Sequence, residues 1–225
     1  MVDAAVAASP TPSAAPRRAP VPITEPDGAK MQRPGYPEAL KAMLDSLDSL
    51  GGKCKMVMVG DSITHGFPLK ESPFAKYSPF NYGQPGDSIQ DAHYRLTRPE
   101  LSKIKPKVVV IMLGTNNMTA TGQPKEIADG VRAVVTKTQA IWPGAHIILM
   151  GILPNGRNAE LAAKASELIA KMDDGKTVHY LNIRDKFVPE GDNWKYLKPD
   201  KVHLLPDGYK VWTEALEPVV SKLMN

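Results

Sequence analysis

Four short polar segments of the sequence carry the side chains that ester hydrolysis requires. The segments are Gly60-Asp61-Ser62, Gly83-Gln84-Pro85-Gly86-Asp87, Gly114-Thr115-Asn116-Asn117 and Asp200-Lys201-Val202-His203. Hydrolysis through a serine uses a nucleophile, a base that takes its proton, a group that orients the base, and donors for the oxyanion. The segments supply a hydroxyl, an imidazole, a carboxylate, a carboxamide and glycines that expose backbone N–H groups. They predict an esterase site if the fold brings them together.

Each of these segments, taken alone, also has an ordinary structural explanation. Ser62 could be a helix N-cap, because a serine side chain accepts a hydrogen bond from an exposed helix N–H. Gly114-Thr115-Asn116 is a common turn sequence, and Gly86 alone would be a turn glycine. Asp200 and His203 could belong to a surface turn. The presence of all four segments after predicted strands favours the catalytic interpretation.

Strands that alternate with helices are expected to position the four segments. Apolar runs predict strands, and apolar residues at helical spacing predict helices. The predicted strands are residues 55–59, 80–83, 107–113, 146–153 and 178–183, and the predicted helices are residues 38–50, 88–96, 124–142, 159–172 and 206–224. This alternation indicates an α/β fold, a three-layer α/β/α sandwich with a five-stranded parallel sheet in flavodoxin-like order. Ligands of such sheets bind beyond the carboxyl ends of the strands, where the polar segments fall.

Residues 1–37 are expected to form a Pro/Ala-rich N-terminal tail in front of one domain, residues 38–225. Eight prolines lie between Pro10 and Pro37, and proline lacks a backbone donor and fixes φ. The tail is either a disordered linker or a strap on the domain, in which case Val21 and Ile23 could dock in a groove. Its Ala-rich start is not an intact signal peptide. A periplasmic or secreted bacterial protein whose signal peptide is absent is a hypothesis for the localisation.

Charge and composition argue against several other classes of protein. The net charge is +4, from 28 basic and 24 acidic residues spread along the chain, so nucleic acid is not an expected partner. No apolar stretch approaches the roughly 20 residues of a membrane span. Cys54 is the only cysteine, which excludes an internal disulfide and a Cys-based metal site. No cofactor or metal is expected, and the sequence does not indicate an oligomeric state.

The four segments resemble the sequence blocks of the SGNH hydrolases, also called the GDSL esterase/lipase superfamily. The matching stretches are GDSITHG, NYGQPGD, LGTNN and DKVH, and the similarity runs from about residue 40 to residue 222. RLTRPELSKIKPKVVVIMLGTNN is especially similar to the branch of platelet-activating-factor acetylhydrolase catalytic subunits and their bacterial esterase relatives. The four blocks together are specific, whereas GDS alone would not be.

This resemblance implies a role for a residue in each block. Ser62 would attack the acyl carbonyl, His203 would transfer the proton, and Asp200 would fix the tautomer of His203. The backbone N–H groups of Ser62 and Gly86 and the side-chain amide of Asn116 would form the oxyanion hole. A glycine at position 86 fits this role, because a Cβ could block the approach of the substrate oxygen.

The sequence also departs from related patterns. Ser62-Ile63-Thr64 lacks the final glycine of the Gly-x-Ser-x-Gly elbow, so an α/β-hydrolase is not indicated. Pro85 stands where relatives in this branch usually carry a further glycine, and it is expected to stiffen the loop. Asp61 is expected to support the local backbone, and Asp87 is expected to cap the helix that follows it.

The expected function is that of a serine esterase that hydrolyses short-chain, acetyl-type acyl esters through an acyl-enzyme intermediate. No long apolar lid segment is visible, which argues against a long-chain lipase, and the resemblance makes acetylated carbohydrate a candidate substrate. The alternative is a phospholipid or platelet-activating-factor-type acylhydrolase. A non-catalytic binding module would be expected to lack one of the four groups. A nucleotide binder would be expected to carry a Walker loop, which the sequence lacks.

Overall fold

Five parallel strands form the centre of the structure, a computed structural model that describes residues 22–119 and 122–225. The strands are β1 (Met56–Gly60), β2 (Phe80–Gly83), β3 (Val108–Met112), β4 (His146–Met150) and β5 (Val178–Leu181). Their order in the sheet is β2-β1-β3-β4-β5, and all neighbouring strands are parallel. This flavodoxin-like order confirms the predicted fold class.

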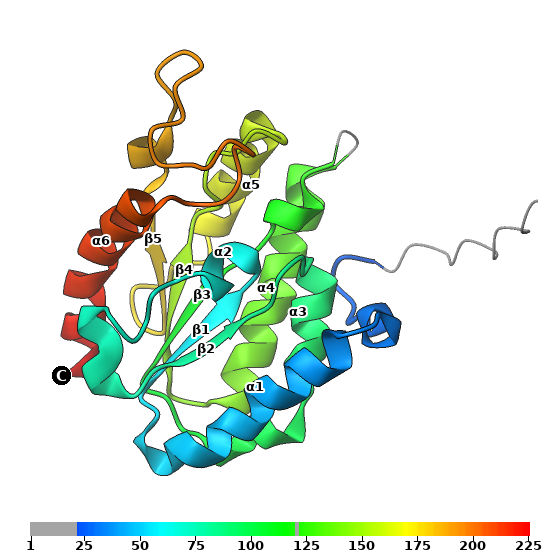
Figure 1. The fold of residues 1–225 in the computed structure, drawn as a ribbon, viewed down its shortest axis with the longest axis vertical. Coiled ribbons are helices and arrows are strands. Elements are labelled where there is room, and N and C mark those ends of the chain that lie inside the picture. Colours follow the sequence, from blue (N-terminus) through cyan, green and yellow to red (C-terminus); the bar gives the residue numbers. More distant parts are fainter. Residues whose placement is uncertain (1–21, 120–121) are drawn as a thin grey trace, which may run out of the picture.

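Helices cover both faces of the sheet and give the three layers seen in Figure 1. The helices are α1 (Tyr36–Leu50), α2 (Ser62–His65), α3 (Ile89–Arg95), α4 (Pro124–Ile141), α5 (Ala159–Ala170) and α6 (Pro206–Met224). α1, α3, α4 and α5 contribute to one apolar cluster, and α6 contributes to the other. The five predicted helices are present, and their ends differ from the prediction by at most two residues. None of the described helices is long and apolar enough to cross a membrane.

The alternation of side chains along the strands lets one sheet serve two apolar cores. In β1, Val57 and Val59 belong to the cluster with α1 and α4, whereas Met56 and Met58 belong to the cluster with α6. All four side chains are fully buried, as expected for a central strand that is covered on both faces. β3 and β4 end before the predicted apolar runs do, because the last apolar residues are buried in loops instead.

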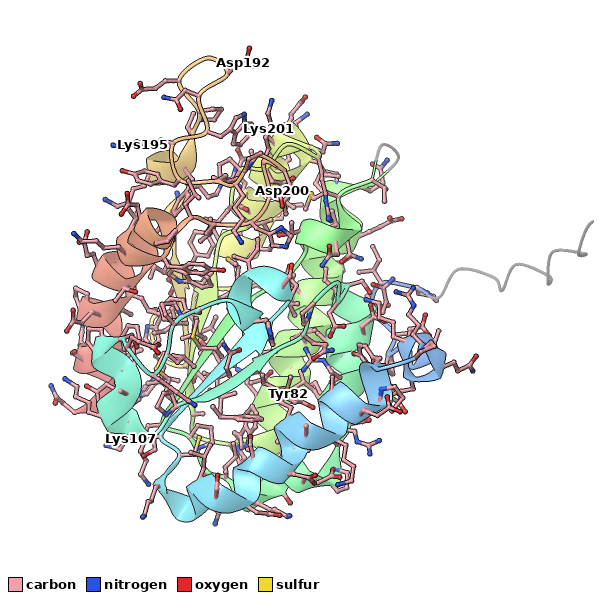
Figure 2. The ribbon with its side chains drawn as sticks, viewed as in Figure 1. Tyr82, Lys107, Asp192, Lys195, Asp200 and Lys201 are labelled. Carbon is pink, nitrogen blue, oxygen red and sulfur yellow. The ribbon has the colours of Figure 1, made fainter. Side chains whose placement is uncertain are left out.

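The polar segments lie beyond one end of this sheet. The last residue of β1, Gly60, is in register with Gly83 of β2 and with Met112 of β3. Figure 2 shows Lys107, which precedes β3, at the opposite end of the sheet from Asp200. The carboxyl ends of the strands therefore bring together segments that are far apart in the sequence.

The described residues before α1, residues 22–35, form the N-terminal segment. Ile23 packs against the cluster with α4, beside Gly130, where a Cβ would collide with it. Lys30 is only 9% exposed. Residues 22–35 therefore lie against the domain, and we call them the strap.

The predicted domain boundary at residue 38 falls inside α1, which begins at Tyr36. Residues 1–21 of the predicted tail, including Val21, lie outside the described residues. The division of the chain into a tail and a domain therefore stays a prediction.

Candidate active site

Ser62 is the first residue of α2, directly beyond the end of β1. Asp61 is the N-cap of this helix, because its Oδ1 accepts the N–H of Ile63 at 2.9 Å. The capping explanation for the serine is therefore wrong, and its hydroxyl is free to bind another group. Gly60 allows the sharp turn, since a Cβ at this position would overlap the side chain of Thr64.

A chain of hydrogen bonds joins Ser62 to His203 and Asp200. His203 Nε2 lies 2.9 Å from Ser62 Oγ, and His203 Nδ1 lies 2.7 Å from Asp200 Oδ2. Asp200 Oδ1 also accepts the backbone N–H groups of Val202 and His203, at 2.9 and 3.0 Å. These bonds, chiefly the one from the His203 side chain, lower the pKa of Asp200 to about 2, so the carboxylate is ionised at neutral pH. An ionised Asp200 keeps the proton on Nδ1, which leaves Nε2 as the acceptor for the Ser62 hydroxyl.

The donors predicted for the oxyanion follow β1, β2 and β3, which are neighbours in the sheet. Among the described residues, the backbone N–H groups of Ser62 and Gly86 have no acceptor. Gly86 has a φ of 76°, a conformation that favours glycine. No described atom lies within 4 Å of a Cβ built at Gly86. The backbone conformation is therefore a second reason for glycine, beside access of the substrate oxygen.

Hydrogen bonds at both ends of its amide orient the Asn116 side chain. Nδ2 donates to the carbonyl of Asp87 at 2.7 Å, which leaves one amide hydrogen for a ligand. Oδ1 accepts Nη1 of Arg157 at 2.7 Å, and the same nitrogen donates to the carbonyl of Thr115 at 3.1 Å. Because a guanidinium group can only donate, Arg157 prevents the amide from flipping.

A buried charge cluster lies next to the loop that carries Gly86. The cluster consists of Lys30, Asp87, Asp91 and Arg95. Arg95 Nε donates to Asp87 Oδ2 at 2.6 Å, and its other nitrogens donate to the carbonyls of Tyr82 and Gly60 at 3.0 and 3.2 Å. Tyr82, which is labelled in Figure 2, belongs to the same apolar cluster as the buried residues of α1. Arg95 therefore ties the ends of β1 and β2 to the loop between β2 and α3.

The prediction that Asp87 caps the following helix is wrong. The N-cap of α3 is Ser88, which forms a capping box with Asp91: each backbone N–H donates to the other side chain. Asp87 points into the interior instead, where Arg95 and the hydroxyl of Tyr36 donate to its carboxylate at 2.6 and 3.0 Å. A buried carboxylate needs such donors, and the sequence around Asp87 does not reveal them.

A cavity of about 630 Å³ opens beside Asn116. Its walls come from the N-terminal segment, the start of α3, the loop after β3 and the start of α4. Polar side chains in the lining include Thr24, Ser88, Asn117 and Glu126. The cavity therefore offers hydrogen-bonding groups to a ligand that also reaches the predicted oxyanion site.

Three basic residues near the site are not among those that the sequence predicts. Arg157 lies beyond the carboxyl end of β4, so extending the search for polar residues to every strand end would include it. Arg95 lies on the buried side of α3. Nothing in the sequence around it indicates that this arginine is buried. Lys30 lies in a Pro-rich segment without periodicity, and no pattern relates this segment to the loop at Gly86.

The sequence matches a known family model over the part of the chain that builds the site. Residues 58–211 match the model of the GDSL-like lipase/acylhydrolase family, and this range includes all the predicted site residues. The chain belongs to this family. Members of the GDSL family hydrolyse acyl esters, and the chain is therefore a carboxylic ester hydrolase, as the sequence predicts.

Individual proteins show how far the similarity extends beyond the family model. Platelet-activating factor acetylhydrolase IB subunit alpha1 of Rattus norvegicus is 29% identical over 186 residues, which are 79% of each chain. A GDSL-like lipase from Bacteroides thetaiotaomicron has a TM-score of 0.66 at 19% identity and covers 81% of this chain and 97% of its own. A carbohydrate esterase family 3 structure from Talaromyces cellulolyticus has a TM-score of 0.58 at 17% identity, with 75% and 97% covered. The two structures show a shared fold.

Proposed function

We propose that this GDSL hydrolase is a serine esterase that removes short, acetyl-type acyl groups through an acyl-enzyme intermediate on Ser62. The observation that supports it most directly is the hydrogen-bonded chain from Asp200 through His203 to the Ser62 hydroxyl. A serine hydroxyl is a weak nucleophile unless an adjacent base takes its proton. His203 is in position to do so, and Asp200 holds the imidazole in the tautomer that this step needs.

In the acylation step, Ser62 Oγ forms a bond to the carbonyl carbon while its proton moves to His203 Nε2. The carbonyl oxygen becomes an oxyanion, which accepts hydrogen bonds from the backbone N–H groups of Ser62 and Gly86 and from Asn116 Nδ2. As the ester C–O bond breaks, the proton on Nε2 passes to the leaving alcohol oxygen. Asp200 stabilises the imidazolium that exists between these two proton transfers.

In the deacylation step, water takes the place of the departed alcohol. His203 Nε2 removes a proton from the water as its oxygen attacks the acyl carbon, and the same three donors hold the second oxyanion. The bond between Ser62 Oγ and the acyl carbon then breaks, and the proton returns from Nε2 to Oγ. A carboxylic acid is released, and the starting state is restored.

Acetylated carbohydrate is the substrate class that we favour. The cavity beside Asn116 supports this choice, because polar side chains such as Thr24, Ser88 and Glu126 suit a leaving group rich in hydroxyls. The second candidate is a platelet-activating-factor-type acetyl phospholipid. It is supported by the rat relative, a platelet-activating factor acetylhydrolase subunit that is 29% identical over most of the chain.

Covalent labelling and a substrate panel test the proposal together. A fluorophosphonate is expected to label the protein, and peptide mass analysis is expected to locate the adduct on Ser62. Hydrolysis of p-nitrophenyl esters is expected to be fastest for acetate and to fall steeply from butyrate onward. An adduct on another serine, or no adduct and no turnover, would contradict the assignment of the nucleophile.

The panel also includes an acetylated xylo-oligosaccharide and an acetyl glycerophosphocholine. We expect a higher kcat/KM for the oligosaccharide, because only it brings several hydroxyls into the polar cavity. The opposite ranking would favour the phospholipid candidate. The variant Thr24→Val provides a control for the cavity, since it is expected to weaken turnover of the oligosaccharide but not of p-nitrophenyl acetate.

A further inference from the structure

The middle of the loop that carries Gly86 is held only through its backbone. Pro85 and Gly86 are exposed, and a glycine has no side chain that could pack. The N–H of Gln84 donates to the carbonyl of Gly60 at 3.1 Å, and the N–H of Asp87 donates to the carbonyl of Gln84 at 3.2 Å. These bonds fix the two ends of the turn. The orientation of its middle depends on what binds the remaining carbonyl groups.

Lys30, from the N-terminal segment, binds one of these carbonyl groups. Its ammonium group donates to the carbonyl of Gly86 and lies 2.6 Å from Asp91 Oδ2 and 3.6 Å from Asp87 Oδ1. The carbonyl of Asp87 accepts the side-chain amide of Asn116. Both carbonyl groups that follow the Gly86 N–H are therefore held, one from the N-terminal segment and one from the predicted oxyanion residue.

The same ammonium group balances charge in the interior. The side chains of Lys30, Asp87 and Asp91 are 11%, 0% and 7% exposed, and Arg95 is fully buried. Two carboxylates thus face two cations in the buried charge cluster. Without Lys30, one negative charge would be unbalanced next to the loop whose N–H must bind a developing negative charge, and like charges repel strongly at low dielectric.

We propose that Lys30 is a positioning residue for ester hydrolysis, which keeps the Gly86 N–H aimed at the oxyanion and neutralises the carboxylates behind it. The inference rests on the proposed function, because it assumes that Gly86 donates to the oxyanion. If Lys30 has this role, the strap before α1 contributes a residue to the active site. Preorganised donors contribute to the rate because they do not have to reorient when charge develops.

The first test compares the steady-state kinetics of two lysine variants on p-nitrophenyl acetate. Lys30→Met is expected to lower kcat by about 10- to 100-fold, less than the loss of a whole oxyanion donor, and to change KM by less than about twofold. Lys41→Met is the matched control, because Lys41 is exposed on α1 and, among the described residues, pairs only with Asp45. A kcat for Lys30→Met equal to that of Lys41→Met would overturn the proposal.

A second variant tests whether charge is the cause. Lys30→Met/Asp91→Asn restores a balanced cluster, and an asparagine keeps an oxygen that can accept the Ser88 N–H. The double variant is expected to recover about three- to tenfold in kcat over Lys30→Met but not the full activity, because the Gly86 carbonyl still lacks its donor. Lys30→Arg, which keeps the charge and the donors, is expected to stay within about threefold of the unchanged protein. A double variant no more active than Lys30→Met would overturn the electrostatic role.

Hydrogen exchange tests the same contact without using ester turnover. The amides of Gln84 and Asp87 are expected to exchange on the order of tenfold faster in Lys30→Met than in Lys41→Met, since the turn loses its support. Equal exchange would overturn the proposal even if the protein hydrolysed no ester. Lack of turnover in the unchanged protein would instead contradict the proposed function, and the exchange data would still decide the role of Lys30.

Discussion

The Asp200–His203 pair is partly exposed to solvent, whereas the Asp87–Arg95 pair next to the oxyanion loop lies in the interior. The side chains of His203 and Asp200 are 37% and 48% exposed, and backbone N–H groups of their own loop hold Asp200. Asp87 and Arg95 are both 0% exposed. An exposed hydrogen-bonded pair stabilises a fold little, while breaking a buried ion pair leaves a charge without compensation. The Asp200–His203 side of the site is therefore held by local bonds at the surface, and the oxyanion side is held by buried charges.

This difference fits what each side has to do in the proposed mechanism. His203 has to exchange protons with Ser62, an alcohol and water, and an accessible imidazole suits that task. The oxyanion donors act best when they are rigid before the charge develops. Local bonds within one loop are sufficient for the first task. The second uses contacts from the N-terminal segment, from α3 and from the ends of β1 and β2.

The largest expected effect on kcat comes from removing the Ser62 hydroxyl, on which both sides of the site act. Ser62→Ala is expected to lower kcat for p-nitrophenyl acetate by on the order of 10⁴-fold or more, because no nucleophile remains. Urea denaturation is expected to give nearly unchanged stability, since Asp61 and not Ser62 caps α2. A Ser62→Ala protein that retained a tenth of the activity would show that the two sides do not converge on this serine.

A matched pair of substitutions tests the contrast in stability directly. Asp87→Asn is expected to lower the free energy of unfolding by about 3–5 kcal/mol, because Arg95 then stays buried without its partner. Asp200→Asn, the same chemical change at an exposed site, is expected to lower it by less than about 1 kcal/mol. Urea titrations at pH 7 measure both values. Similar losses for the two variants would remove the distinction between a buried and an exposed half.

Asp61 is a buried acid beside the nucleophile, and its titration is expected to make the free energy of unfolding depend on pH. Burial raises its pKa to about 6, and no donor among the described residues reaches its Oδ2. The folded protein therefore binds the proton more tightly than the unfolded chain, whose aspartates titrate near 3.9. Between about pH 4 and pH 6, the free energy of unfolding is expected to fall as the pH rises, by up to about 3 kcal/mol.

Asp61→Asn removes this titrating group and keeps an oxygen that can cap α2. Urea titrations of both proteins at pH 4.5 and pH 7 measure the slope. The variant is expected to lose less stability between these two values than the unchanged protein. The same pH dependence of stability in both proteins would mean that the pKa of Asp61 is not raised. Buried charge would then be confined to the oxyanion side of the site.

Arg157 connects the two halves and gives the smallest expected effect. It orients Asn116, and its neighbour Gly156 donates its N–H to the carbonyl of Lys201 in the loop of Asp200. Arg157→Met is expected to lower kcat about tenfold, because only the Asp87 carbonyl then holds the amide of Asn116 and the amide is less well oriented. In an Asn116→Ala background the same substitution is expected to have little further effect. Additive losses would show that Arg157 acts on the substrate and not through Asn116.

The sequence predicts the parts of the site that follow from local pattern. The β-branched run at residues 107–113 predicts a strand buried on both faces, and the structure has one at residues 108–112. Ser62 and Asn116 could be proposed as site residues because each follows such a run. Gly86 follows the predicted strand at residues 80–83, which has no β-branched residue, and its positive φ could be read only from the structure.

The parts that the sequence does not predict depend on contacts between distant segments. Asp87 precedes Ser88, and both residue types cap helices, so only the position of Arg95 decides which of them does so. The role of Lys30 depends on how a segment without periodic pattern crosses the domain. Tertiary contacts of this kind override local preference, and a single sequence contains no direct record of them.

The distance along the chain between the groups of the site has a consequence for how activity arises during folding. Ser62 and His203 share a hydrogen bond although 141 positions separate them, and Lys30 and the Gly86 carbonyl are 56 positions apart. Closing such long loops costs entropy before the contacts repay it, so contacts of this kind form late. Helices, whose contacts are local, can form much earlier. After dilution from denaturant, ester turnover is therefore expected to recover more slowly than helical circular dichroism.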